Sequence, residues 1–330
     1  MESENRQRIY INEVVTRDGF QIEPSFVPTE EKIKLINRLS RSGVAMIEAT
    51  SFTSPKAIPN LRDAEEVMRQ IERVAGVRYT VLIPNVKGCE RAIGCGVDEI
   101  NLVMSASQTH NQANLRMSCE QSLAQFAEIV KFATGAPVSI NASLSTSFGC
   151  PFDGAVAEQR VLDVVRRFLE LGIQSVTLCD TTGMANPRQV RSLCKVVKAR
   201  WPDVKFTMHF HNTRGMGLAN AVAALEAGML HFDASHAGLG GCPFAPGASG
   251  NICTEDTVHM FEQMGYDTGV KLDLLLEIAG DLPAIVGHDV PGQLIKSGKA
   301  DKRYPVPEWL GKDQIALAGK PAAAPPNASR

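Results

Sequence analysis

The stretch "SVTLCDTTGMANPRQVRSLCKVVKARWPDVKFTMHFHN", residues 175–212, contains one complete strand–helix–strand unit. Residues 175–182 form a short, β-branched and apolar run that ends in polar side chains. Residues 186–201 carry apolar residues at helical spacing, and Pro187 lies just inside the start, where a missing N–H costs nothing. Residues 206–212 again resemble a strand. The stretch therefore predicts two parallel strands joined by a crossover helix.

The same alternation continues along most of the chain. Candidate strands lie at 8–15, 45–51, 78–84, 99–106, 138–146, 175–182, 206–212 and 230–236. Helix-like segments between them include 28–43, 118–135 and 157–172. Eight strands, each followed by a helix, predict an α/β protein with a closed parallel (β/α)8 TIM barrel. A doubly wound sheet would need about five or six strands and a glycine-rich fingerprint after the first, which "TRDGFQ" (16–21) does not provide.

Residues 1–290 are therefore predicted to form a single barrel domain. An additional C-terminal helical region is expected at 253–265 and at about 270–287. The glycine-rich loop 237–251 is expected to lie over the active site. Residues 291–330 form a C-terminal extension, and its last part, 319–330, is rich in proline and alanine and is expected to be disordered.

The composition excludes several classes of protein. Of the 330 residues, 44% are apolar and 21% are charged, with a net charge of −2, so neither a nucleic-acid nor a membrane-surface partner is expected. The chain lacks a transmembrane-length apolar run, and "MESENRQR" (1–8) lacks the apolar core of a secretion signal, which predicts a cytoplasmic protein. The eight cysteines form no CxxC pair, so a zinc ribbon or disulfide framework is not expected.

Two histidines, His209 and His211, end the strand at 206–212. Because strand side chains alternate, the two imidazoles project from one face and would meet at the mouth of a barrel. Asp18, at the end of the first strand, would add a carboxylate, since the first strand closes against the eighth. This donor set suits Mg²⁺, Mn²⁺, Co²⁺ or Zn²⁺, and oxygen-rich octahedral coordination would favour Mg²⁺ or Mn²⁺. The alternative is that each histidine is a hydrogen-bonded core residue.

Further polar side chains stand at predicted strand ends, where (β/α)8 enzymes carry their active sites. These are Arg17, Glu48, Asn141, Ser143, Ser145, Asp180 and Thr181, with Cys242 and Asn251 in the last loop. The planar fork of Arg17 suits an enolate oxygen, and the flexibility of Gly19 would let Arg17 and Asp18 reach one pocket. Arg17 could also brace the barrel through a salt bridge to Asp180. Cys242 is a candidate proton donor that arrives on loop closure, unless the segment is only a flexible barrel-closing loop.

At these residues the chain resembles the hydroxymethylglutaryl-CoA lyase family, within a superfamily of metal-dependent lyases and Claisen synthases. The resemblance covers roughly residues 8–290. It rests on "RDGFQIE" (17–23), "IEATSFTSPKAIPNL" (47–61), "GCPFDG" (149–154), "CDTTGMANP" (179–187), "HFHNTRGMGLAN" (209–220) and "GLGGCPFAPGASGNICTED" (238–256). The last motif is the most specific, because it resembles the family's signature loop around a catalytic cysteine.

The resemblance implies a role for each matching residue. The ligands of a divalent cation, Mg²⁺ or Mn²⁺, would be Asp18, His209, His211 and Asn251. The catalytic residues would be Arg17, Glu48, Asp180, His209 and Cys242. The substrate would be bound by Arg17, Gln21, Asn141 and Ser143.

The reaction implied is the retro-Claisen cleavage of 3-hydroxy-3-methylglutaryl-CoA to acetyl-CoA and acetoacetate, as in leucine catabolism and ketone-body formation. Chelation of the C3 hydroxyl and a carboxylate oxygen would lower the hydroxyl pKa, a base would take its proton, and the C2–C3 bond would break. Arg17 would stabilise the enolate, Cys242 would protonate its carbon, and His209 would assist proton transfer. The partner is thus an acyl-CoA, and a homodimer is a further expectation.

The sequence departs from the family at substrate-facing positions. Asn141 and Ser143 fall where the family typically has Arg and Tyr, and Phe20 and Ile22 replace Leu and Asn. The histidine motif continues with Asn-Thr-Arg-Gly (212–215) in place of Asp-Thr-Tyr-Gly. The chemistry is therefore better supported than the substrate, and citramalyl-CoA or a longer 3-hydroxy-3-alkylglutaryl-CoA are alternatives.

Two further alternatives concern the class of protein. A Claisen-type synthase shares the RDG and HxH residues, but "GGCP" (240–243) stands where the synthases use a loop containing Glu and Arg. A barrel that has lost catalysis and serves as a scaffold would not need to retain the candidate ligands. A measurement of bound metal in the purified protein separates the scaffold from both enzymes.

Overall fold

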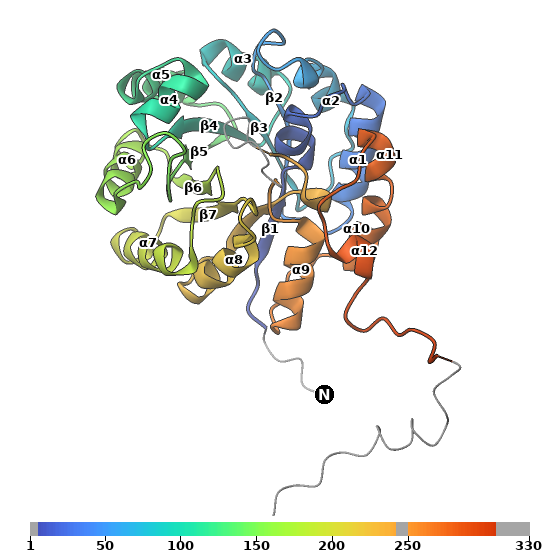
Figure 1. Cartoon of the computed structure of the whole chain (residues 1–330). Coiled ribbons are helices and arrows are strands. Elements are labelled where there is room, and N and C mark those ends of the chain that lie inside the picture. The colour runs from blue at the N-terminus through green and yellow to red at the C-terminus, as the bar shows by residue number, and fades with distance from the viewer. Residues whose placement is uncertain (1–5, 242–249, 308–330) are drawn as a thin grey trace, which may run out of the picture. The chain divides into compact units, whose positions relative to one another are not determined.

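The computed structural model describes residues 6–241 and 250–307, and its strands close into one parallel barrel in the order β1 to β8 (Figure 1). The strands are β1 (Tyr10–Glu13), β2 (Met46–Ser51), β3 (Arg78–Leu82), β4 (Glu99–Ser105), β5 (Ser139–Ser145), β6 (Ser175–Asp180), β7 (Lys205–Phe210) and β8 (His231–Ala234). The barrel closes where β1 pairs in parallel with β8. The predicted (β/α)8 TIM barrel is confirmed.

Helices surround the barrel (Figure 1). Those between strands are α1 (Thr29–Ser40), α2 (Ala64–Gln70), α3 (Val86–Gly94), α4 (Gln108–Leu115), α5 (Cys119–Ala133), α6 (Glu158–Glu170), α7 (Pro187–Arg200) and α8 (Gly217–Glu226). The helical region after the eighth strand comprises α9 (Thr254–Gln263), α10 (Leu272–Ala279), α11 (Leu282–Val286) and α12 (Leu294–Ser297). None of the helices in the described ranges is both long and apolar enough to span a membrane.

The compact unit that contains the barrel ends at Ser297. Residues 298–307 carry no helix or strand. Most of the predicted active-site loop, 242–249, and the tail that was predicted to be disordered, 319–330, lie outside the described residues.

The alternation of side chains along each strand separates an apolar shell from a polar barrel interior. On β4, Ile100 and Leu102 are fully buried in the hydrophobic core, which also includes apolar residues of the surrounding helices. Glu99 and Asn101, which alternate with these two residues, project into the barrel, together with Thr177 of β6. Because the core surrounds a ring of polar side chains, hydrogen bonds can run across the barrel towards its mouth.

A buried carboxyl group ties the end of β1 to the segment after β8. Glu13 Oε1 accepts the backbone N–H groups of Val15 and His236, each at 2.9 Å, and Oε2 accepts the hydroxyl of Thr254 at 2.8 Å. Glu13 is fully buried, and burial raises its pKa from 4.5 to about 8. This carboxyl group therefore anchors the turn that follows β1 to the start of α9.

We expect Glu13 to make stability fall as the pH rises. A pKa raised in the folded state gives stability that is complete below about pH 4.5 and is lost as the pH rises towards 8. Glu13→Gln keeps the shape and cannot ionise, so the free energy of unfolding should fall less between these pH values than in the wild type. Denaturant unfolding across the range measures this. Glu128→Gln, at an exposed position, should follow the wild type, and an identical slope in Glu13→Gln would contradict the expectation.

Candidate active site

The chain after β1 makes a single π-helical turn, η1 (Val15–Gly19). The carbonyl of Val14 accepts the backbone N–H groups of Arg17, Asp18 and Gly19, at 3.2, 2.7 and 3.3 Å. This wide turn removes the strand alternation that would have pointed neighbouring side chains to opposite faces. Arg17 and Asp18 therefore lie together, with their side chains in direct contact.

Gly19 is needed for space. Its backbone is not in the left-handed region, and a Cβ there would lie 2.9 Å from the side chain of Val15 and 3.3 Å from Ser235 Oγ. The expectation that backbone flexibility of Gly19 joins Arg17 and Asp18 is therefore wrong. Any larger residue would push η1 away from the segment that follows β8.

Arg17 is held between two carboxylates. Its Nε and Nη2 lie 2.5 Å from Glu48 Oε2, and Nη1 contacts Asp18 Oδ1. Burial lowers the pKa of the guanidinium, but the charges of Asp18 and Glu48 outweigh burial and raise it above its ordinary value. Among the described residues, its ion-pair partners are these two and not Asp180, so the alternative of an Arg17–Asp180 salt bridge is wrong.

Three candidate cation ligands converge beside this arginine. β7 ends at Phe210, and His211 follows directly. His209 Nε2 lies 3.2 Å from His211 Nε2 and 3.9 Å from Asp18 Oδ2. One ligand atom from each of Asp18, His209 and His211 lies within 4.8 Å of the others. The strand alternation, the turn after β1 and the barrel closure thus bring the predicted ligands to one point.

Two of the three candidate ligands, Asp18 and His211, have pKa values that suit a divalent cation. Burial raises the pKa of Asp18, but Arg17 and His209 outweigh it, and the pKa falls to about 2. Burial, followed by the charge of His209, lowers the pKa of His211 to about 3, and His211 Nδ1 has no hydrogen-bond partner among the described residues. At neutral pH the cluster offers a carboxylate and a neutral imidazole, the ligand types that Mg²⁺, Mn²⁺ and Zn²⁺ accept.

Asn251, the fourth expected ligand, reaches the cluster from beyond β8. His211 forms an antiparallel bridge with Asn251, whose Nδ2 donates to Asp18 Oδ2 at 2.7 Å and to the carbonyl of Leu239 at 3.0 Å. Gly240 has a φ of +99°, and a Cβ there would lie 2.6 Å from Asn251 Nδ2. Glycine at this position therefore leaves room for the amide beside Asp18.

Asp233 completes the cluster and was missed by sequence reasoning. Its Oδ2 lies 3.3 Å from His209 Nδ1, and its Oδ1 accepts Asn12 Nδ2 at 2.9 Å. Burial lowers the pKa of His209, but the hydrogen bond to Asp233 and the charge of Asp18 raise it above its ordinary value. Asp233 therefore orients the ring and leaves Nε2 facing His211. The available signal was an acid inside the apolar run "HFDA" (231–234).

Asp180 lies at the end of β6 and holds the loop that follows. Its Oδ1 accepts the backbone N–H groups of Met184 and Ala185, at 2.7 and 2.9 Å. Its Oδ2 is buried and has no hydrogen-bond partner in the part of the chain that the structure describes. Burial raises the pKa of Asp180 to about 6. Asp180 is expected to organise the pocket, and its two hydrogen bonds to this loop are the structural basis of that expectation.

The expected substrate residues have different surroundings. Gln21 is half-buried and lies two residues after the end of η1. Asn141 and Ser143 lie inside the barrel, and both donate to Asn101 Oδ1, at 3.0 and 2.9 Å. Their roles in substrate binding stay predictions. Cys242 lies outside the described residues.

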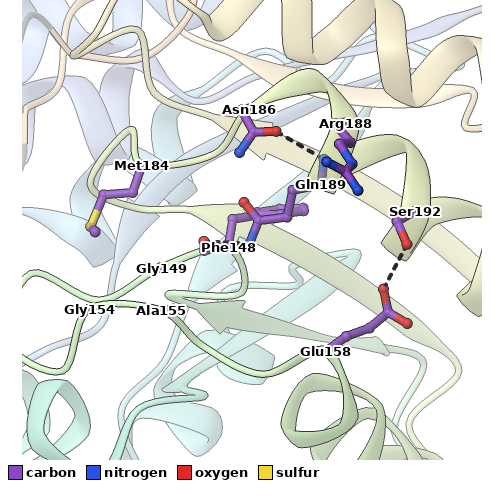
Figure 2. Close-up of a pocket in the computed structure, with 10 residues that line it drawn as sticks. All are labelled: Phe148, Gly149, Gly154, Ala155, Glu158, Met184, Asn186, Arg188, Gln189 and Ser192. Atoms are coloured by element: carbon purple, nitrogen blue, oxygen red, sulfur yellow. Dashed lines mark hydrogen bonds between the residues drawn. The ribbon is translucent and has the colours of Figure 1, made fainter.

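An open pocket also lies beside the start of α7, lined in part by Phe148, Met184 and Glu158 (Figure 2). Gln189 N donates to Asn186 Oδ1 at 3.1 Å, the local bond that caps α7. None of the candidate cation ligands lines this pocket. The candidate active site is therefore the buried cluster beside Arg17, apart from this pocket.

The fold and the site define a class: a (β/α)8 barrel with a candidate divalent-cation site at the carboxyl ends of its strands. The HMGL-like family model matches residues 8–282, and the chain belongs to this family.

Individual relatives share most of their length with this chain. It is 44% identical to a hydroxymethylglutaryl-CoA lyase of Bacillus subtilis, over 89% of this chain and 98% of the relative. It is 38% identical to an (R)-citramalyl-CoA lyase of Chloroflexus aurantiacus, over 91% and 96%. A solved HMG-CoA lyase of Acinetobacter baumannii, in complex with coenzyme A and 3-methylmalate, is 52% identical with a TM-score of 0.89, covering 93% of this chain and 100% of that one.

Loss of one histidine should remove the cation. We expect the wild type to bind Mn²⁺ in equilibrium dialysis and His211→Ala to bind it at least about tenfold more weakly, because even neighbours of metal ligands typically contribute that much. His259→Ala, in α9, is the matched control and should bind as the wild type does. Wild-type affinity in His211→Ala would remove this residue from the site.

Proposed function

We propose that this chain is a divalent-cation-dependent carbon–carbon lyase that cleaves 3-hydroxy-3-methylglutaryl-CoA into acetyl-CoA and acetoacetate, the ketone body also formed in leucine breakdown. The observation that carries the proposal is the buried Arg17 guanidinium beside the Asp18–His209–His211 cluster. Family membership and the relatives named lyases support it. Cytoplasmic location and a homodimer remain predictions.

The reaction requires one deprotonated hydroxyl and one stabilised enolate. Asp18, His209, His211 and Asn251 are the residues that would hold Mg²⁺ or Mn²⁺. When bound, the cation supplies Lewis acidity that lowers the pKa of a ligated hydroxyl group. Loss of that proton to a base lets the C2–C3 electron pair move into the thioester, which gives acetoacetate and the acetyl-CoA enolate.

Arg17 stabilises the enolate oxygen. Its guanidinium is permanently charged and is fixed by Glu48 and Asp18, so no reorganisation is needed as charge develops. Deep burial strengthens its effect, because water does not screen the charge. Asp233 holds Nδ1 of His209, which keeps Nε2 of that ring directed into the site.

Cys242 supplies the proton that completes acetyl-CoA. The thiol proton goes to the enolate carbon, and the proton lost by the C3 hydroxyl goes to the base, so one proton leaves the substrate and one enters. The position of Cys242 in the family's signature loop supports this assignment.

A related acyl-CoA is a second candidate substrate. The citramalyl-CoA lyase relative and the 3-methylmalate in the solved neighbour both concern methyl-substituted malyl groups, which are shorter than the 3-hydroxy-3-methylglutaryl group. Ser143 also stands where the family typically has Tyr, so the substrate-facing residues differ from those of the family. The cleavage chemistry is the same for either substrate.

Incubation with Mg²⁺ and a panel of 3-hydroxyacyl-CoAs, followed by identification of both products by mass, tests the function. The panel contains the 3-hydroxy-3-methylglutaryl, longer 3-hydroxy-3-alkylglutaryl and citramalyl thioesters. We expect acetyl-CoA and acetoacetate from the first, and no products after exhaustive chelation until Mg²⁺ or Mn²⁺ is restored. Faster turnover of citramalyl-CoA would favour the second candidate. Absence of cleavage of every thioester would contradict the lyase assignment.

A further inference from the structure

Three side chains inside the barrel form a hydrogen-bonded group below Arg17. They are Asn101 of β4 and Asn141 and Ser143 of β5, exposed by 6, 6 and 7%. The remaining space among the polar residues of the barrel interior is about 10 Å³, room for about one water molecule. The side chains must therefore satisfy most of one another's hydrogen bonds.

The bonds of this group have a fixed direction. Asn101 Oδ1 accepts both Asn141 Nδ2, at 3.0 Å, and Ser143 Oγ, at 2.9 Å. Asn141 is itself held by β6, since its Oδ1 accepts Ser175 Oγ at 2.9 Å and its Nδ2 donates to Thr177 Oγ1 at 3.0 Å. The oxygen of Asn101 faces the amide nitrogen of Asn141, and a flipped Asn101 amide would place Nδ2 against that nitrogen.

The nitrogen of the Asn101 amide consequently faces the catalytic arginine's partner. Asn101 Nδ2 donates to Glu48 Oε1 at 2.8 Å, while Glu48 Oε2 accepts Arg17 Nε at 2.5 Å. Each carboxylate oxygen thus has its own donor. The terminal torsion of a glutamate is soft, so its hydrogen bonds set the plane of the carboxylate.

We propose that Asn101 is a positioning residue for the cleavage reaction. It fixes the plane of the Glu48 carboxylate, and that carboxylate fixes the Arg17 guanidinium from the side opposite Asp18. The inference rests on the proposed function, in which Arg17 stabilises the enolate. If Asn101 only joined β4 to β5, its replacement in a variant that folds would leave turnover unchanged.

Asn101→Leu has similar size and removes both the donor and the acceptor. We expect kcat to fall by about tenfold to hundredfold, the effect of a displaced catalytic group, with KM within about threefold of the wild type. Asn111→Leu is the matched control, because Asn111 is a fully buried amide that bonds to Met117 O, Ser122 Oγ and Ser105 N. The control should lose thermal stability and keep kcat.

A double-mutant cycle shows whether Asn101 acts through Glu48. Glu48→Gln should also lower kcat, and the double variant should be about as slow as the slower single variant, because both changes release the same arginine. The proposal would be overturned if the fold-losses in kcat of the two single variants multiplied in the double variant. An unchanged kcat in folded Asn101→Leu would also overturn it. If Asn101→Leu does not fold, Ser143→Ala replaces it in the cycle. Ser143→Ala should lower kcat by a smaller factor, and its combination with Glu48→Gln should be no slower than Glu48→Gln alone. An unchanged kcat in Ser143→Ala, or fold-losses that multiply in the combination, would overturn the proposal.

Crystal structures separate this inference from the proposed function. If the wild type cleaves none of the thioesters, the lyase assignment fails, and the geometry of Asn101→Leu still tests the positioning role. We expect a rotated Glu48 carboxylate and a displaced Arg17 guanidinium. Glu48 and Arg17 superimposable on the wild type would overturn the proposal whatever the substrate.

Discussion

The burial of Arg17 between Glu48 and Asp18 is the constraint on which the site depends. A guanidinium removed from water is costly unless carboxylates and hydrogen bonds surround it, and loss of either partner leaves a buried charge uncompensated. The π-helical turn after β1 places Asp18 against the arginine, and β2 supplies Glu48. Asp18 then serves two sites, because Oδ1 contacts Arg17 while Oδ2 faces Asn251 and His209. The candidate cation site and the proposed enolate site are therefore neighbours through one carboxylate.

The barrel separates stability from chemistry. Outward-facing apolar residues of the strands pack in the hydrophobic core that includes the helices, and this burial provides the main driving force for folding. The interior instead holds amides, hydroxyls and acids, such as the pair Asn12–Asp233 and the group around Asn101. Each buried polar group costs free energy unless it is paired, so such an interior persists only as a connected network. Here the network ends on the side chains that orient His209 and Arg17, which gives these two candidate catalytic residues rigid supports.

The sequence was sufficient where short periodicities decide the outcome. Strand–helix alternation predicted the barrel, and the two-residue spacing of His209 and His211 predicted that both rings share one face. The sequence was insufficient where residues that are far apart along the chain contact one another. Besides Asp18, the ion-pair partner of Arg17 is Glu48 rather than Asp180. Gly19 is required for space rather than flexibility, and Asp233 meets His209 on the neighbouring strand. These depend on barrel register and on one π-helical turn, which no local pattern specifies. Resemblance to a family supplied Asn251, whose ligand role no local pattern had indicated.

The turnover of Arg17→Lys tests the central claim most directly. A lysine ammonium cannot reproduce the planar fork that joins Glu48 and Asp18. The account predicts that kcat falls by about 10²–10³, as for loss of a preorganised oxyanion donor, while Mn²⁺ affinity stays near that of the wild type. Arg8→Lys, which changes an exposed ion pair with Asp267, should leave both quantities unchanged. A near-normal kcat in Arg17→Lys would contradict the account and would leave Arg17 as a structural brace of the barrel.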